Sequence, residues 1–296
     1  MKTIGREQLR FTFDKADAPE ARVSSGESVR FLCQDCYNGQ LAEDGQAYET
    51  MDMDFCNPVS GPLYVEGAEP GDVLKVTVRE ILLTSPASMC VRLGSGVYEV
   101  PGCHCRRFSL RDGYALFDEG IRIPLKPMVG VMGVCPAGEA VTTLTPGEHG
   151  GNLDIRDLHE GSEVYLPVAV PGALLSMGDL HAVQGDGETA VCALECAGEV
   201  TVRVDVIKTD AYIPTPMIVT YTHFITAAAH ESLDVCSVEA ARKMHKFLTA
   251  HSPLPAAEAA MLLSLRGNLR ISQVVNPKKG CIMEFPRDAA PIQWNY

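Results

Sequence analysis

Valine alternates with a polar residue through the stretch Val200-Thr201-Val202-Arg203-Val204-Asp205-Val206. A period of two places the valines on one face of a strand and the polar residues on the other, as in a half-buried β-strand. The pattern recurs in Leu74-Lys75-Val76-Thr77-Val78-Arg79-Glu80-Ile81, directly after the turn Glu69-Pro70-Gly71-Asp72. Gly161-Ser162 introduces a further strand in the same way. Together these patterns predict an all-β body.

The C-terminal quarter follows a helical period instead. From Leu233 to Thr249, apolar residues recur every three or four positions behind Asp234, a residue type suited to the N-cap, which predicts an amphipathic helix. A second helix is predicted from Pro255 to Leu265, with Gly267 placed to end it. Residues 268–276 return to strand character. The sequence therefore predicts an α+β segment after the β body.

The composition is that of an ordinary globular protein. The 296 residues are 46% hydrophobic and 21% charged, with a net charge of −13. The negative charge and the lack of a Lys/Arg run exclude nucleic acid as a partner, because phosphates require a basic surface. The start of the chain has no apolar signal segment, and no stretch is long and charge-free enough to span a bilayer. We expect a soluble cytoplasmic protein with a small neutral ligand.

Eleven cysteines, an odd number, occur without an export signal, which predicts reduced thiols and no disulfides. Cys33 and Cys36 form a C-x-x-C, and Cys103 and Cys105 a C-x-C, so the four could hold a structural zinc ion. The alternative is that these thiols are small buried hydrophobic residues. The sequence favours the alternative.

One stretch concentrates acid/base chemistry: Gly178-Asp179-Leu180-His181-Ala182-Val183-Gln184-Gly185-Asp186-Gly187-Glu188 has four ionisable side chains and no Lys or Arg. Carboxylates and imidazole are donors that zinc accepts, and the glycines permit a tight loop. A similar stretch lies about thirty residues earlier, Pro146-Gly147-Glu148-His149-Gly150-Gly151-Asn152-Leu153-Asp154-Ile155-Arg156. Solvated Gly/Asp turns are the alternative for each stretch alone. Two such stretches predict a shared pocket.

These two stretches resemble the acetamidase/formamidase family, and further segments share the resemblance. The matching segments are Gly61–Leu74, Gly130–Ala137, Gly150–Asp154, Val168–Leu175 and Met177–Glu188. The resemblance extends from about Phe31 to about Pro286. It implies hydrolysis of a small aliphatic amide of the formamide or acetamide type to a carboxylate and ammonia. The donors of the two stretches and the needs of this reaction predict a divalent metal, zinc, as cofactor.

For the fold, the resemblance implies a jelly-roll-like β-sandwich with a smaller β-barrel part and a terminal α/β piece. We therefore expect residues 1–213 to form the all-β body, with the barrel-like part at about 60–145, and residues 214–296 to form the C-terminal α+β segment. Pro214 and Pro216 mark the boundary. The resemblance also implies a homodimer or higher homo-oligomer, for which the C-terminal helices offer Leu248, Met261 and Leu262 as contacts.

For the metal, His181 is the predicted imidazole ligand. The predicted carboxylate ligands are Asp35 and either Asp179 or Asp186. Asp35 is selected because Asp35-Cys36-Tyr37-Asn38-Gly39-Gln40 matches the family's pattern of an acid and a cysteine before a small polar residue and glycine. Asp154 is a further ligand or an orienting residue, unless it only caps a turn or pairs with Arg156.

For catalysis, Glu188 is the predicted proton shuttle between water and the departing nitrogen. The side-chain amide of Asn152 is expected to donate to the oxyanion, and His149 to complete the pocket as a second ligand or an orienting residue. Glu195 is also a predicted site residue, because a carboxylate flanked by apolar residues on a strand needs a cation or metal partner.

Three alternatives remain open from the sequence. The first is hydrolysis of a small cyclic amide, a lactam. The second is a cysteine-nucleophile amidase that uses Cys135, and chelation together with Cys135→Ser separates it from a metal hydrolase. The third is a non-catalytic binding protein in which a structural calcium ion holds the loops together, and calcium is also possible as a second ion in the enzyme.

Overall fold

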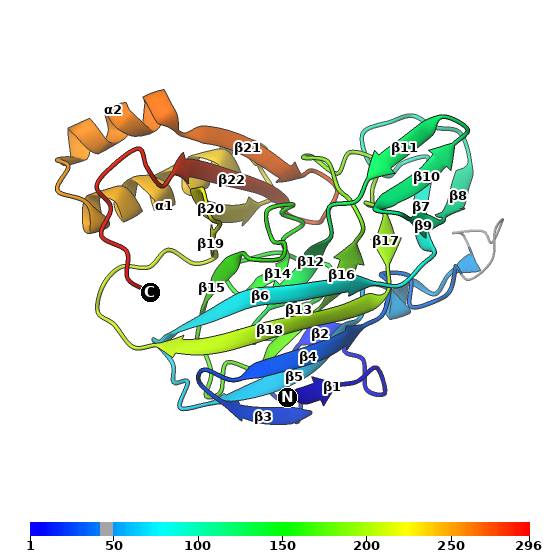
Figure 1. Cartoon of the computed structure of the whole chain (residues 1–296), viewed down its shortest axis with the longest axis horizontal. Coiled ribbons are helices and arrows are strands. Elements are labelled where there is room, and N and C mark those ends of the chain that lie inside the picture. The colour runs from blue at the N-terminus through cyan, green and yellow to red at the C-terminus, as the bar shows by residue number, and fades with distance from the viewer. Residues whose placement is uncertain (42–49) are drawn as a thin grey trace.

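The computed structural model describes residues 1–41 and 50–296, and two large β-sheets form most of it (Figure 1). The first sheet has nine strands. In order across the sheet they are β1 (Lys2–Ile4), β4 (Ser28–Cys33), β18 (Gly198–Ile207), β6 (Val73–Leu83), β15 (Glu163–Pro167), β19 (Met217–Val219), β20 (His223–His230), β22 (Lys279–Pro286) and β21 (Asn268–Gln273).

The second large sheet has eight strands and carries the functional residues. Its main order is β14 (Gly150–Asn152), β12 (Met128–Gly133), β16 (Leu175–His181), β17 (Glu195–Cys196), β7 (Ala87–Arg92) and β8 (Cys103–Phe108), with β5 (Val59–Glu66) paired to β16 and β3 (Ala21–Ser24) paired to β5.

Smaller elements complete the described chain. A three-stranded sheet consists of β11 (Ile121–Pro124), β10 (Tyr114–Asp118) and β9 (Leu110–Arg111), and a two-stranded sheet of β13 (Val141–Thr142) and β2 (Thr12–Phe13). The 3-10 helix η2 spans Met53–Phe55. The helices are α1 (Leu233–His251) and α2 (Ala256–Arg266).

The predicted alternation builds the core between the two large sheets. Strand β18 is buried at every second residue, and Val200, Val202 and Val204 are fully buried. These valines share one apolar cluster with Met177 and Leu180 of β16, in the opposite sheet. Burial of this apolar surface stabilises the sandwich by roughly 25 cal/mol per Å². The predicted mainly β sandwich is therefore confirmed.

Both predicted helices are present and pack on the end of the nine-stranded sheet formed by β19, β20 and β22 (Figure 1). The N-cap of α1 is Ser232, whose hydroxyl accepts from the backbone of Val235, so the prediction of Asp234 as the cap is wrong by two residues. Leu248 of α1 is fully buried and so is not available to a second copy, whereas Met261 of α2 is 65% exposed. No described helix is long and apolar enough to cross a membrane.

The expectation of reduced thiols is wrong for one pair. Cys90 and Cys105 form a disulfide, with a Cα–Cα distance of 4.3 Å. They are direct partners on the adjacent strands β7 and β8, a position that brings Cβ atoms close together. The pairing of these strands could not be inferred from cysteine spacing. The other nine cysteines are free.

Candidate metal and catalytic site

Strands β16 and β17 place one imidazole and two carboxylates together. Asp179 and His181 are two residues apart on β16 and so point to the same face. Glu195 on β17 is the direct cross-strand partner of His181. The Nε2 atom of His181 lies 3.3 Å from a carboxylate oxygen of Asp179 and 3.3 Å from one of Glu195. All three side chains are at least 95% buried.

Asp154, two residues after β14, brings a third carboxylate to the same point across strand β12. Gly130 lies between β14 and β16, and its carbonyl oxygen accepts from the backbone N–H groups of Leu153 and Asp154. A Cβ atom on Gly130 would lie 2.6 Å from Asp179 Oδ2 and 2.7 Å from Asp154 Oδ1. Because glycine leaves this space free, Asp154 reaches to 3.9 Å from His181 Nε2.

The loop between β16 and β17 supplies the fourth carboxylate. The backbone of Gly187 pairs with β21 and the residues after it, donating to Ser272 and accepting from Val274. This pairing holds Glu188 inward, where it is 7% exposed and has a carboxylate oxygen within 4.8 Å of one of Asp154. The C-terminal strands therefore support the loop that carries the predicted proton shuttle.

Three of the four carboxylates sit on strained backbone. Asp154, Asp179 and Glu188 have φ angles of 45°, 55° and 44°. Residues other than glycine rarely adopt this left-handed region, and each such residue costs about 1–3 kcal/mol unless its surroundings enforce it. The fold thus maintains the convergence of these side chains against local preference, as is common at functional sites.

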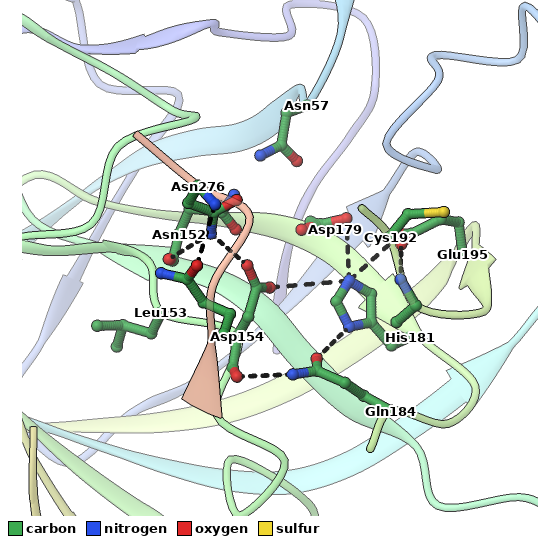
Figure 2. A network of polar contacts seen from close by, with 12 residues as sticks. Asn57, Asn152, Leu153, Asp154, Asp179, His181, Gln184, Cys192, Glu195 and Asn276 are labelled. Carbon is green, nitrogen blue, oxygen red and sulfur yellow. Dashed lines mark hydrogen bonds and ion pairs between the residues drawn. The ribbon is translucent and has the colours of Figure 1, made fainter. Parts of the chain in front are cut away.

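Gln184 determines which nitrogen of His181 faces the carboxylates (Figure 2). Its Nε2 amide donates to the backbone oxygens of Asp154 at 2.8 Å and Ser272 at 3.3 Å. Carbonyl oxygens only accept, so this contact fixes the amide orientation and leaves Gln184 Oε1 facing His181 Nδ1 at 2.8 Å. Nδ1 must therefore carry a proton, and Nε2 is the nitrogen available to a metal.

The cluster is electrostatically incomplete. Among the described residues, no Lys or Arg forms an ion pair with any of the four carboxylates. The buried atoms without a hydrogen-bond partner include Asp179 Oδ1, His181 Nε2, Glu188 Oε2 and Glu195 Oε2. Buried charges are normally paired or bound to metal, and a protonated His181 alone does not balance four ionised carboxylates.

The pKa values follow from this burial. Burial, and then the charge on Asp179, raises the pKa of Asp154 to about 7. Burial, and then the charge on Glu195, raises the pKa of Asp179 to about 7. Burial and the Asp154 charge raise the pKa of Glu188 well above its ordinary value. Burial alone would lower the pKa of His181, but the carboxylates of Glu195 and Asp179 raise it well above its usual range. Protons held by these groups therefore reduce the net charge of the cluster.

Two groups of side chains have the spacing of metal ligands. Donor atoms of Asp154, His181 and Glu188 lie within 4.8 Å of one another, and so do those of Cys36, Asp179 and Glu195. Two zinc ligands with bonds of about 2.0–2.1 Å in tetrahedral geometry are separated by roughly 3.3 Å. The carboxylate oxygens of Asp179 and Glu195 lie at this distance from His181 Nε2, and that of Asp154 lies at 3.9 Å.

A cavity of about 180 Å³ opens onto these carboxylates. Its polar wall includes Asp154, Asp179, Glu188 and Glu195 together with the amides of Asn57, Asn152 and Asn276. Its apolar wall is formed by Met53, Leu144, Val191, Val275 and Pro277. A water molecule occupies roughly 30 Å³ in the liquid, so the cavity has room for a ligand of a few heavy atoms and some water.

Five predicted site residues converge in the structure: Asp154, Asp179, His181, Glu188 and Glu195. Asn152 also lies at the cavity, but with its amide nitrogen turned toward Asp154 it donates to both carboxylate oxygens, at 3.0 and 3.2 Å. Its oxygen then accepts from Asn276 Nδ2 and Asn57 Nδ2. Its amide is thus engaged with Asp154, and the predicted oxyanion contact would require it to leave this partner.

Asp35, Asp186 and His149 do not line the cavity. Asp35 Oδ1 accepts from the backbone N–H groups of Tyr37 and Gly39 and so shapes the turn after β4. Asp186 points outward and forms a two-point ion pair with Arg270, 2.9 Å at each contact. It is not one of the described metal-ligand groups.

His149 is buried with its ring edge against Phe13, at a centroid distance of 5.1 Å. Burial, and then the charge on Lys278, lowers the pKa of His149 to about 4. The ring is therefore neutral at ordinary pH, in an aromatic contact and outside the cavity lining. Cys135 also lies outside that lining, in an apolar cluster, and burial raises its pKa to about 12, which disfavours it as a nucleophile.

Sequence reasoning missed Cys36, Gln184 and Asn276 as site residues. Asn276 Nδ2 donates to Asp154 Oδ2 at 2.6 Å and to the backbone oxygen of Asn152 at 3.2 Å. Its only sequence signal is the Asn-Pro pair with Pro277 after a strand, which reads as an ordinary turn. For Cys36 and Gln184, the signal was their position inside the two matched motifs.

Comparison with known proteins gives matches to amidases along most of the chain. The model of the acetamidase/formamidase family matches residues 12–141 and 130–276. A crystal structure of an acetamidase from Bacillus halodurans is 40% identical, with a TM-score of 0.94 over 96% of this chain and 97% of that chain. A predicted acetamidase/formamidase from Thermoanaerobacter tengcongensis is 36% identical, with a TM-score of 0.95 over 99% of both chains. A formamidase of Methylophilus methylotrophus is 29% identical over 78% of this chain and 72% of its own length.

Proposed function

The chain belongs to the acetamidase/formamidase family and hydrolyses linear amides, and we propose that it does so with a divalent zinc ion held by Asp154, His181 and Glu188. The observation that carries the proposal is the position of the Nε2 atom of His181 among the buried carboxylates. Gln184 directs this atom toward buried carboxylates, and it has no hydrogen-bond partner there. A cation at this point satisfies the imidazole and the carboxylates together.

Amide hydrolysis needs an activated water, stabilisation of the oxyanion and a proton for the departing nitrogen. A bound zinc ion lowers the pKa of its water to about 7 and polarises the carbonyl oxygen. The chain supplies the remaining functions. Asn152 and Asn276 donate to Asp154 and hold its carboxylate in place. Gln184 holds the His181 ring.

Glu188 is the residue with the properties of a proton shuttle. It lines the cavity, it is 7% exposed, and its Oε2 has no hydrogen-bond partner. Burial and the adjacent Asp154 raise its pKa, which suits a group that takes a proton from water and returns it to nitrogen. Glu188 also lies within 4.8 Å of donor atoms of Asp154 and His181. One of its carboxylate oxygens can therefore bind the metal while the other carries the proton.

The cavity favours a small aliphatic amide. Its 180 Å³ and the apolar side chains of Leu144, Val191 and Val275 accept a hydrogen or methyl acyl substituent. A pocket distinguishes substrates that differ by one methylene by only about 1–3 kcal/mol, so formamide and acetamide are both expected to react. A small lactam is the competing substrate, and because its hydrolysis opens the ring and releases no ammonia, it is followed by the amino acid that forms.

Glu188→Gln tests the mechanism. Glutamine keeps the shape and one oxygen donor but cannot carry the proton, so kcat for ammonia release from acetamide should fall about 10²–10⁴-fold while bound zinc is retained. Steady-state kinetics and elemental analysis of the same preparation measure both quantities. Glu163→Gln on the nine-stranded sheet is the control and should keep wild-type kcat. Unchanged kcat in Glu188→Gln would remove Glu188 from the chemistry.

A further inference from the structure

One amide oxygen at the wall of the cavity has no partner. Four buried side-chain oxygens of this wall make no hydrogen bond to any residue in the described part of the chain. Three of them belong to carboxylates around His181, namely Asp179 Oδ1, Glu188 Oε2 and Glu195 Oε2. The fourth is Oδ1 of Asn57, a residue that is 4% exposed. A metal ion and a proton shuttle account for the three carboxylate oxygens and leave this neutral acceptor without a role.

The start of β5 places Asn57 beside the carboxylates. Val59 pairs with Gly178 of β16, the residue before Asp179. A Cβ atom on Gly178 would lie 2.3 Å from the backbone oxygen of Pro58, so glycine at this position lets the start of β5 approach β16 closely. Asn57 has a φ angle of 57°, in the left-handed region that Asp179 also adopts. The fold therefore holds both side chains at the cavity against local preference.

The hydrogen bonds of Asn57 determine which end of its amide is free. Its Nδ2 donates to the backbone oxygen of Thr143 at 3.4 Å and, with the Asn152 amide oriented as above, to the side-chain oxygen of Asn152 at 3.2 Å. Both partners only accept, which identifies the nitrogen end of the amide. Oδ1 is then the free end. Figure 2 shows the oxygen of Asn57 on the side of Asp179 and the nitrogen on the side of Asn276.

A primary amide presents two kinds of polar group to this cavity. Its carbonyl oxygen only accepts hydrogen bonds, and its nitrogen carries N–H donors. In the function proposed above, on which this inference rests, the carbonyl oxygen of the substrate faces the metal beside His181. The nitrogen then needs an acceptor in the same cavity. Asn57 Oδ1 supplies an acceptor that carries no charge and is not needed to hold a proton.

We propose that Asn57 Oδ1 accepts a hydrogen bond from the nitrogen of the bound amide and thereby determines which carbonyl compounds the site takes. An amide with at least one N–H satisfies this oxygen. An ester, a ketone or an N,N-disubstituted amide has no such donor and leaves the oxygen buried and unpaired, which costs more than one hydrogen bond contributes. A site built around a substrate N–H therefore discriminates against analogues that lack it. Asn57 is a specificity-determining residue for amides that carry an N–H.

Acetamide and acetone test this proposal as a pair. Acetone has the shape of acetamide, with a methyl group in place of the NH₂ group, and it competes for the site without being hydrolysed. Asn57→Gly removes the acceptor and keeps the left-handed backbone, which glycine adopts freely. In this variant the KM for acetamide should rise about tenfold, the size of one hydrogen bond, because the N–H contact is present in the bound substrate and in the transition state alike. The inhibition constant of acetone should not rise.

Asn38→Gly is the matched control. Asn38 has a φ angle of 54° and lies outside the cavity lining, so its replacement should leave both constants at the wild-type value. If the two constants rise by the same factor in Asn57→Gly, Asn57 has only a structural role and the proposal is overturned. It is also overturned if neither constant changes.

The wild type gives a test that needs no variant. Its inhibition constant for acetone should exceed its KM for acetamide by about tenfold or more, and equal values would contradict a hydrogen bond from the substrate nitrogen. Both constants come from one preparation, so this comparison is independent of the metal test. Ammonia release by protein free of metal would overturn the proposed zinc site, whereas equal constants in a zinc-dependent enzyme would overturn the role of Asn57 alone.

Discussion

Gln184 shows how one residue outside the set of ligands determines the chemistry of another. It is 6% exposed, and each end of its amide has only one sensible partner, carbonyl oxygens for Nε2 and a ring N–H for Oε1. The His181 ring is therefore held in both rotation and tautomer. This kind of support is a common determinant of metal affinity.

Gln184→Leu should weaken zinc binding about 10–100-fold, because the ring loses the acceptor that keeps Nε2 toward the carboxylates. Competition with a coloured chelator measures the affinity. Gln40→Leu, whose amide contacts Asp52 and Cys56 among the described residues and not His181, should bind zinc like the wild type. Equal affinity in Gln184→Leu and the wild type would show that the ring needs no such support.

At the scale of residues, the sequence predicted the site best where its members lie close together in the chain. Asp179, His181 and Glu188 could be named because they lie in one glycine-rich stretch, and Asp154 because a similar stretch carries it. The prediction of Asp186 as a possible ligand failed to anticipate Arg270, which is 84 residues away and pairs with it. Local sequence does not show which acid has a distant cationic partner.

At the scale of elements, the pairing of β14, β12 and β16 brings carboxylates from two distant stretches together across one glycine. Gly130 separates Asp154 from Asp179, and no side chain fills the gap. The strands themselves were predictable from alternation, as were the two helices from their apolar spacing. Which strands are neighbours was not, since pairing depends on packing between residues far apart in the chain.

Gly130→Ala should abolish high-affinity zinc binding and amide hydrolysis, because its methyl group would lie within 2.8 Å of three oxygens of Asp154 and Asp179. Overpacking of this kind also costs about 1–3 kcal/mol of stability. Gly185→Ala, in the loop that carries Glu188, is the matched control, because a methyl group there meets nothing within 4 Å. Zinc titration and thermal unfolding of both variants check the prediction, which wild-type zinc affinity in Gly130→Ala would contradict.

At the scale of the whole molecule, the site joins parts of the chain that are far apart in sequence. Strands β16 and β17, the loop between them and the residues after β21 meet at the carboxylates. A metal bound there would therefore raise the free energy of unfolding. The pKa shifts make this linkage depend on pH. The pKa values of Asp154 and Asp179 are raised from an ordinary value of 3.8 to about 7 in the metal-free fold.

A carboxyl group with a raised pKa binds its proton more tightly in the folded chain than in the unfolded one. Its contribution to stability is complete below about pH 4 and is lost as the pH rises through about 7. The Tm of the metal-free chain should therefore fall between about pH 5.5 and pH 8, and the gap to the zinc-loaded chain should widen. Asp179→Asn, which cannot ionise, should reduce the fall. A metal-free Tm that rises over this interval would contradict the assigned direction.

We propose that this amidohydrolase depends on a metal held by His181 and the surrounding carboxylates. The most direct measurement is ammonia release from formamide and acetamide by one preparation before chelation, after chelation and after restoration of zinc, with the metal content measured at each step. We predict that ammonia release disappears with the metal and returns with it, and that His181→Ala neither retains zinc nor recovers activity. Full activity in protein shown to be free of metal would contradict the metal dependence of amide hydrolysis.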